Sequence, residues 1–462
     1  MESFWDYNVW GGLNLLIVLL LALIAANMIK RSIPWLEASL VPTSVLGGVL
    51  LLIVAGIYRA VTGELFFDTP FFGGNGMANL EVITYHTLAL GFIASTFKGG
   101  KGKMTKQRTV EIFNTGVNTV STYLLQAVVG LGITLIAARV IAGFFPAAGV
   151  LLPFGYGQGT GQALNYGGIY EAEFGFAGGK SFGLTVAAMG FLSASIGGVI
   201  HLNILKHKGK IRIAPKEEAA ISTEQVQGEN EIPMQGSMDK LTVQMALIAG
   251  AYFLTYLMML GLGKLLPGMR SVIYGFNFLL GVVAATLIKV VVNFLQRKRV
   301  INRKYINDFL MTRCSNFFYD IMVVAGIAAI RLGIVGRYWG ILLILGVGGL
   351  LVTYFYNLLT ARALFKDYPE EQFLTMYGML TGTASTGVIL LREIDNEFKT
   401  PAADNMVYQN FPAIVFGFPL MLLATLAPQK PLLTWLIFLG FFAGMNLLLF
   451  RSFLFRKRKK KE

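Results

Sequence analysis

Residue types that build most catalytic, metal-binding and disulfide-stabilised sites are scarce in this sequence. Its 462 residues include one cysteine, Cys314, and three histidines. A single cysteine cannot form an internal disulfide, so cysteine usage does not indicate a redox compartment. The chain has no HExxH or GxSxG motif, no P-loop and no Cys/His cluster at metal-ligand spacing. These absences argue against a zinc hydrolase, a serine hydrolase and an ATP-driven pump, and we expect neither an enzyme nor a cofactor.

Charged residues are also scarce. They make up 14% of the chain, whereas a typical soluble domain has about 25%. The hydrophobic fraction is 55%, and the mean hydropathy is +0.62. The apolar residues come in runs of about 20, which is enough for a helix to cross a hydrocarbon layer of roughly 30 Å. The composition therefore predicts an all-α polytopic membrane protein.

The net charge of +14 comes from basic clusters between the apolar runs and from the tail RKRKKKE at 456–462. Loops on the cytoplasmic side of a membrane carry such clusters, whereas acidic residues such as Glu64 and Asp68 fall in loops expected outside. We therefore expect the N-terminus outside, the C-terminus inside and no nucleic-acid partner. The tail is either a topology anchor or a contact for anionic lipid headgroups.

The apolar runs divide the chain into two halves. Residues 1–205 form a predicted first membrane repeat and residues 240–427 a second. Residues 206–239 are charged and lack a long apolar run, so they are expected to form a cytoplasmic linker. Residues 428–462 add one extra span and the basic tail. The expected spans lie at about 11–29, 42–58, 82–97, 111–143, 181–205, 240–262, 271–295, 315–332, 338–360, 406–427 and 431–452.

Five crossings in the first half place the start of the second half on the opposite side of the membrane. The halves are then expected to be inverted five-helix repeats, as in many secondary transporters. A Gly-rich stretch lies between the fourth and fifth spans of each half, PFGYGQGTGQALNYGGIY at 153–170 and MYGMLTGTASTGVILL at 376–391. Both are apolar but too short and too Gly-rich to span. Since broken backbone in lipid must be covered by protein or line a wet cavity, we predict re-entrant hairpins at about 150–175 and 371–394, with tips meeting near the membrane mid-plane.

Such tips suit an anionic substrate and a small cation. Free N–H groups at a helix N-terminus favour a carboxylate, and free carbonyls with threonine and serine hydroxyls supply oxygen ligands for sodium. Gln158, Gln162 and Asn165 can both donate and accept hydrogen bonds. The alternative is that these small residues only permit close helix packing.

Two further features flank the hairpins. Thr115, Asn118, Thr122 and Gln126 recur at three- and four-residue spacing, which places them on one helical face. They either line the site or bond neighbouring helices together. Arg392 follows the second hairpin, where its guanidinium either binds a substrate carboxylate or extends to the cytoplasmic interface.

Several motifs resemble the glutamate:sodium symporter (ESS) family. They are VPTSVLGGVLLLI, LLQAVVGLGI, GYGQGTGQALNYGGIYE, TGTASTGVILLREIDNEF and NMVYQNFPAIVFGFPLMLLA, and the likeness covers about residues 11–427. The resemblance implies sodium-coupled glutamate uptake across a bacterial inner membrane, ten spans in two inverted repeats, a homodimer and elevator-like movement of a transport domain. The chain departs from the family where Gln158 replaces the His of Gly-His-Gly-Thr, and where residues 383–386 lack the Pro of Gly-Ala-Thr-Pro. These departures concern the substrate more than the fold or the coupling.

The residues and the resemblance together predict a sodium-coupled symporter of glutamate or a related small (di)carboxylate. A proton-coupled or exchange transporter for another organic anion is the alternative, with a channel as a further one. The expected substrate contacts are Gln158, Gly159, Thr160, Gln162, Asn165, Ser385, Thr386 and Arg392. The expected sodium ligands are Gly155, Gly157, Thr381, Gly382 and Thr383, and the expected supporting residues are Asn118, Thr122 and Gln126.

Overall fold

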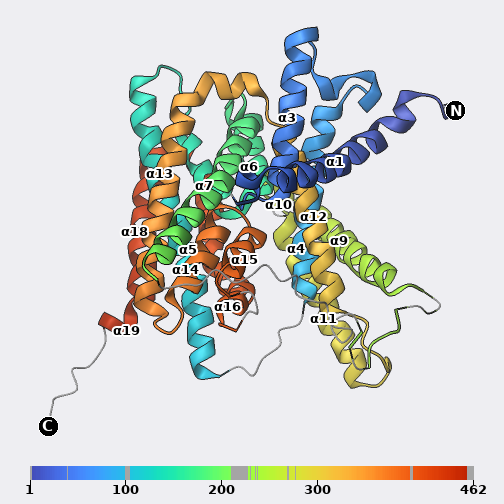
Figure 1. Ribbon diagram of the computed structural model, residues 1–462, viewed down its shortest axis with the longest axis vertical. Helices are drawn as coiled ribbons and strands as arrows, with labels where there is room; N and C mark the ends of the chain where they lie inside the picture. The colour runs from blue at the N-terminus through green and yellow to red at the C-terminus, as the bar shows by residue number, and fades with distance from the viewer. Residues whose placement is uncertain are drawn as a thin grey trace. The chain divides into compact units, whose positions relative to one another are not determined.

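The computed structural model describes residues 3–38, 40–98, 105–209, 227–228, 230–234, 236, 238–267, 270–275, 277–395 and 399–454. Most of the expected linker 206–239, the basic tail from 455 onward and the side chain of Ser385 lie outside the described part. The described chain is helical (Figure 1), and it divides into two compact units. Unit 1 comprises Met1–Ile24, Gly47–Lys101 and Pro215–Ala329, and unit 2 comprises Ala25–Leu46, Gly102–Ala214 and Ile330–Glu462. Each unit thus combines segments from both halves of the sequence.

Unit 1 contains helices from the beginning of each half, and α1 and α3 are shared between the units at their ends. Asp239 caps α9 by accepting from the backbone of Leu241, and Asn307 caps α12 by accepting from Leu310. Apolar side chains of α4, α9 and α12 form its core. Its helices are α1 (Tyr7–Ser32), α3 (Thr43–Thr62), α4 (Gly76–Phe97), α9 (Lys240–Leu265), α10 (Arg270–Gly275), α11 (Asn277–Arg297) and α12 (Asp308–Ala328).

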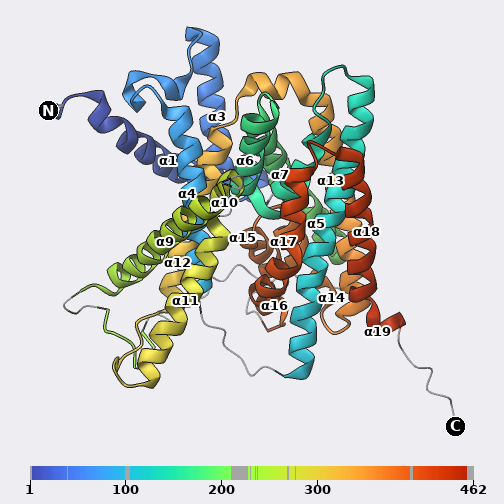
Figure 2. The same ribbon diagram turned by 180° about the vertical axis from the view of Figure 1, so that it is seen from behind.

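Unit 2 contains the later helices of each half and the short α2. The long helices α5 and α13 pack against each other, and α17 and α18 lie along α5 (Figure 2). Gly175 and Gly178, both at positive φ, end α6 and begin α7, so the chain turns sharply between them. Its helices are α2 (Pro34–Ala38), α5 (Lys106–Val140), α6 (Leu151–Phe174), α7 (Gly179–His207), α13 (Leu332–Leu364), α14 (Pro369–Thr381), α15 (Ala384–Arg392), α16 (Ala402–Tyr408), α17 (Asn410–Leu426), α18 (Pro431–Leu449) and α19 (Arg451–Leu454).

Nine helices of the described chain are long and apolar enough to cross a membrane, and the bent pair formed by α16 and α17 makes a tenth candidate. This is consistent with the predicted polytopic membrane protein. The helix found at the expected span 315–332 is α12, which begins earlier, at Asp308, and is not among these candidates. Arg313 and Asp320 give it a more polar character than its neighbours.

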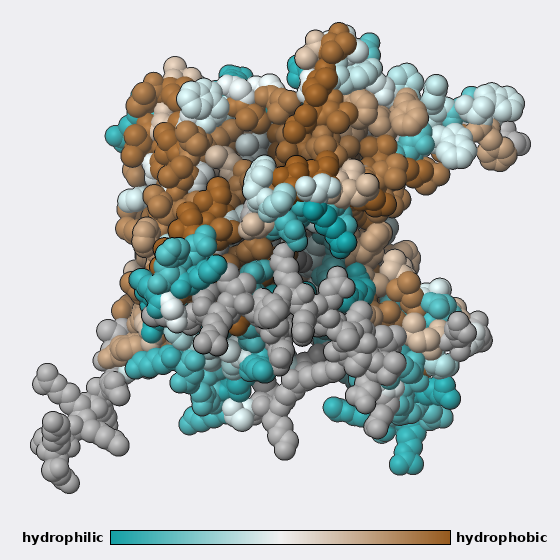
Figure 3. Space-filling view, viewed as in Figure 1, coloured by the Kyte–Doolittle hydropathy of each residue, from teal (hydrophilic) through white to brown (hydrophobic). Residues whose placement is uncertain are grey.

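The surface of α13 shows how these helices differ from those of a soluble protein. Leu343, Val347 and Leu351 recur every four residues on its exposed side, while the polar Thr353 and Asn357 are buried. Hydrophobic side chains accordingly cover the face over α13 and α18 in Figure 3. An apolar exterior over a polar interior matches a lipid solvent, because lipid provides no partner for a polar group.

Candidate functional site

The helix α6 is broken at Gly159. This residue has φ 81° and ψ −171°, a conformation that only glycine adopts without strain. The rings of Phe154 and Tyr166, twelve residues apart in the sequence, stack with their centroids 3.8 Å apart. A straight helix would separate such residues by about 18 Å. The two arms of α6 therefore run back along each other from Gly159.

The second break lies between α14 and α15. Helix α14 ends at Thr381, Gly382 is non-helical, and Thr383 caps α15 by accepting a hydrogen bond of 3.4 Å from the backbone of Thr386. Gly378 and Gly387 meet where the two helices touch, since a Cβ added to Gly378 would lie 2.8 Å from Gly387 Cα. These two helices also run back along each other.

One face of α5 contacts both breaks. Tyr123 Oη donates to the carbonyl of Gly157 at 3.1 Å, next to the break in α6. One turn further on, Gln126 Nε2 donates to the carbonyl of Leu380 at 3.0 Å, at the end of α14, and to Thr353 Oγ1 at 2.8 Å. Carbonyls that the breaks leave without a helical partner are thereby satisfied. The arrangement also brings the two breaks together within unit 2.

A glycine on α7 confirms how closely the broken segments approach each other. A Cβ added to Gly190 would lie 2.5 Å from the Thr381 carbonyl oxygen and 3.2 Å from Tyr156 Cα. Only a residue without a side chain fits between α6 and the end of α14 at this point. Sequence reasoning did not single out Gly190, because α7 contains several glycines and nothing in its sequence marks this one.

Asn118 and Thr122 also face a partner helix. Asn118 Nδ2 donates to Asn357 Oδ1 at 2.8 Å, and Asn357 Nδ2 contacts Thr122 Oγ1 at 3.3 Å. These side chains are buried, and they join α5 to α13. Asn118 Oδ1, Gln126 Oε1 and Gln162 Nε2 are buried without a hydrogen-bond partner among the residues described. Asn118, Thr122 and Gln126 thus bond α5 to neighbouring helices. The unpaired atoms of Asn118, Gln126 and Gln162 are polar groups that a ligand can use.

Most of the other predicted site residues lie on the two broken segments. Thr160 and Gln162 are buried on the second arm of α6, where Gln162 Oε1 accepts from Asn165 at 3.3 Å. Thr381 is buried and donates to the Tyr377 carbonyl at 2.6 Å. Arg392 is different, because it is exposed at the far end of α15, about 12 Å of helix from the break.

Buried tyrosines fix the arms to the surrounding helices. Tyr156 Oη lies 2.6 Å from the Gly346 carbonyl on α13 and 2.8 Å from Ser193 Oγ on α7. Tyr377 Oη donates to the Ser193 carbonyl at 2.7 Å. Because a buried phenol needs a hydrogen-bond partner, each of these contacts fixes the position of an arm. The broken segments are therefore held in place by tyrosines of the Gly-rich stretches themselves, which bond to α7 and α13.

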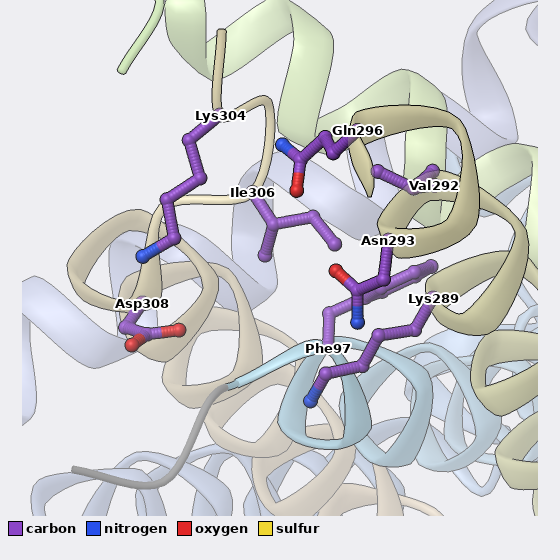
Figure 4. A pocket seen from close by; sticks show the side chains of 8 residues that line it. All are labelled: Phe97, Lys289, Val292, Asn293, Gln296, Lys304, Ile306 and Asp308. Atoms are coloured by element: carbon purple, nitrogen blue, oxygen red, sulfur yellow. The ribbon is translucent and has the colours of Figure 1, made fainter. Parts of the chain in front are cut away.

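A separate cavity of about 150 Å³ lies in unit 1 (Figure 4). Lys289 and Lys304 approach it from either side, with Asp308 beside Lys304. Lys289 donates to the carbonyl oxygens of Thr96 and Lys98. A cation there complements the negative C-terminal end of α4, so Lys289 has a structural role, and the cavity is not part of the site on α5.

Comparison with known protein families finds no family whose sequence profile matches this chain, and comparison with curated proteins finds no relative.

Proposed function

We propose that this protein is a secondary transporter, and that it imports glutamate or another small (di)carboxylate together with sodium. The observation that carries the proposal is the pair of contacts from α5 to the two breaks, made by Tyr123 and Gln126. Two broken helices that meet inside an apolar helical unit supply backbone N–H and C=O groups where few other ligands exist. Transporters use such groups for anionic substrates and for sodium, respectively.

The chain order supports inverted repeats with re-entrant hairpins. In each half, three long helices that lie wholly or mainly in unit 1 come first, followed in unit 2 by a long helix, a broken segment and a last helix or helix pair. The long helices correspond closely, since α5 has 35 residues and α13 has 33. A broken segment that runs back along itself re-emerges on its entry side, so it does not count as a crossing. This order leaves five crossings in each half and α18 as the extra span.

The division into two units supports an elevator-like mechanism. Both broken segments and their supporting helices belong to unit 2, so this unit can carry the bound solutes as one body. Unit 1 then serves as the stationary scaffold, and we propose that it also forms the homodimer. The protein would act in a bacterial inner membrane with its N-terminus outside and its C-terminus in the cytoplasm, as the basic clusters indicate.

The residues at the breaks define the proposed binding steps. Sodium binds first, to carbonyl and hydroxyl oxygens of Gly155, Gly157 and 381–383. A substrate carboxylate then binds the N–H groups that begin α15 and the second arm of α6, which lack helical partners. Bound sodium offsets the negative charge of the substrate, so that the loaded site can cross an apolar layer at lower free energy. Binding and translocation, rather than catalysis, are the activity that this arrangement supports.

Uptake into proteoliposomes tests the proposal. Purified protein is reconstituted, and labelled glutamate uptake is measured with an inward sodium gradient, with equal sodium on both sides, and with an inward proton gradient in sodium-free buffer. Accumulation that needs the sodium gradient and is competed by unlabelled glutamate supports the proposal. Accumulation driven by protons alone would show that protons, not sodium, are the coupling ion. Accumulation driven by exchange with another organic anion would show that the protein is an exchanger. Single-channel currents would show that the protein is a channel and not a transporter.

A further inference from the structure

A second polar cluster in unit 2 surrounds His201 of α7. This side chain is 2% exposed, and both of its ring nitrogens have partners. Nδ1 lies 2.8 Å from Tyr354 Oη on α13, and Nε2 lies 2.8 Å from Glu370 Oε2 on α14. Glu370 is in the first turn of α14, about 16 Å of helix from Thr381 at its other end. The cluster is therefore distinct from the two breaks.

The protonation pattern of the cluster follows from its contacts. Arg362 Nη2 donates to Glu370 Oε1 at 3.0 Å. The hydrogen bond from His201, with the charge of Arg362, holds the pKa of the Glu370 carboxyl below its usual range although burial opposes this. An ionised carboxylate only accepts, so Nε2 of His201 must carry a hydrogen. In the neutral ring Nδ1 then accepts from the Tyr354 hydroxyl.

We propose that His201, Tyr354 and Glu370 form a proton-binding site that controls how firmly the first turn of α14 is held. A proton added to Nδ1 needs only a rotation of the Tyr354 hydroxyl, which then accepts instead of donating, and no heavy atom has to move. The hydrogen bond from the neutral ring of His201 to the ionised Glu370 becomes an ion pair, because the protonated ring places a positive charge beside the carboxylate and adds a Coulomb attraction to the bond. Acid pH therefore ties α14 more firmly to α7.

Charged groups of both signs surround the ring. Acidic groups of α14 lie on one side, and the basic Arg362 is half-exposed and already paired with Glu370. The other titratable or charged groups on α7 and the helices packed against it are Tyr156, Tyr166, Tyr170, Glu171 and Glu173 of α6, Lys180, Lys206 and His207 of α7, Arg337, Tyr338 and Tyr356 of α13, Glu371 and Tyr377 of α14, Arg392 of α15, and Asp395 just beyond it.

The consequence for transport rests on the proposed function. Helix α14 begins at this cluster and ends at the break that is proposed to bind sodium. Movement of α14 during binding or release must work against the tie between Glu370 and His201. We therefore expect uptake to slow as the pH falls through the range in which a histidine gains its proton, about pH 8 to 5.

Hydrogen exchange of α14 tests the site without any need for transport. Amide exchange of residues 371–376 is measured by mass spectrometry at about pH 6 and about pH 8 and corrected for the intrinsic pH dependence. The wild type should show protection about fivefold greater at the lower pH, a factor that corresponds to about 1 kcal/mol. His201→Gln keeps a neutral donor for Glu370 but cannot take up a proton, and it should show no such difference. His207→Gln, which changes an exposed histidine of the same helix, should behave like the wild type.

Equal protection at both pH values in the wild type, or a pH difference that persists in His201→Gln, would overturn the proposal. If His201→Gln does not fold, Tyr354→Phe replaces it, because loss of the hydroxyl removes the acceptor for the protonated Nδ1 and should at least halve the pH difference. Uptake then separates the two proposals. The uptake rate of His201→Gln at pH 6 should equal that of the wild type at pH 8. If neither the wild type nor any variant shows sodium-driven uptake, but the hydrogen-exchange result is as expected, the transport function is wrong and the proton-binding site stands.

Discussion

The contact between Gln126 and the end of α14 allows a quantitative test of the site. Gln126→Leu keeps the size of the side chain but removes the donor to the Leu380 carbonyl and to Thr353 Oγ1. Gln126 is fully buried, so the Leu380 carbonyl loses its partner in a place that water does not reach. Leaving such a group unsatisfied costs about 1–3 kcal/mol. If that free energy falls on the sodium-binding state, sodium should bind about fivefold to a hundredfold more weakly.

The assay is the sodium concentration that gives half-maximal uptake, together with the melting temperature of the purified protein. Tyr356→Phe is the matched control, because it removes a partly buried hydrogen bond of 2.8 Å from α13 to Asn446 on α18 and leaves the breaks untouched. This control should lower the melting temperature while the sodium dependence stays unchanged. A Gln126→Leu protein whose sodium dependence lies within twofold of the wild type would refute the idea that α5 positions the break.

Two further predictions concern other contacts. Gly190→Ala should impair uptake, because its Cβ would lie 2.5 Å from the Thr381 carbonyl oxygen and overpacking costs about 1–3 kcal/mol. Gly440→Ala is the control and should leave uptake unchanged, because Gly440 has open space around it. Equal uptake by the two variants would contradict the close approach of α7 to the end of α14. In unit 1, Lys240 is fully buried and lies 2.7 Å from Glu231, so Glu231→Gln should destabilise the protein by about 3–5 kcal/mol. Burial opposes ionisation of Glu231, but hydrogen bonds from Lys240 and Asn307 lower its pKa overall. Its stabilising effect is thus present above about pH 4.3 and is lost in more acid solution, and melting curves that show the same acid loss in the variant would refute the assignment.

The sequence predicted the helical, polytopic character because that character depends on composition alone. Runs of apolar residues and the low charge of the chain identify membrane-crossing helices without any knowledge of tertiary contacts. The Gly-rich stretches also identified the two broken segments, since glycine at 159 and 382 weakens a helix locally. The resemblance to a symporter family, the coupling ion and the substrate stay predictions.

The supporting residues could not be predicted in the same way. Gln126 and Asn118 were expected on one face of their helix, but the sequence left open whether they serve a ligand or a neighbouring helix. Asn118 contacts α13, and Gln126 contacts both α13 and the end of α14. Tyr123 and His201 went unnoticed because aromatic and histidine side chains in an apolar run look like ordinary packing residues. Their roles depend on partners that lie 34 to 169 residues away in the chain.

The second break gives a physical meaning to a departure from the family that the sequence resembles. Thr386 stands where that family commonly has proline. Its backbone N–H donates to Thr383 Oγ1, which a proline could not do because it has no N–H. Thr386 also brings its own hydroxyl to 3.3 Å from Thr383 Oγ1 in a buried position. The beginning of α15 is therefore capped by side chains of this chain, and on the proposed function a substrate there would meet two hydroxyls where a proline ring would offer only apolar surface. If the proposed function holds, we expect a substrate with more hydrogen-bonding groups near its carboxylate to fit this tip.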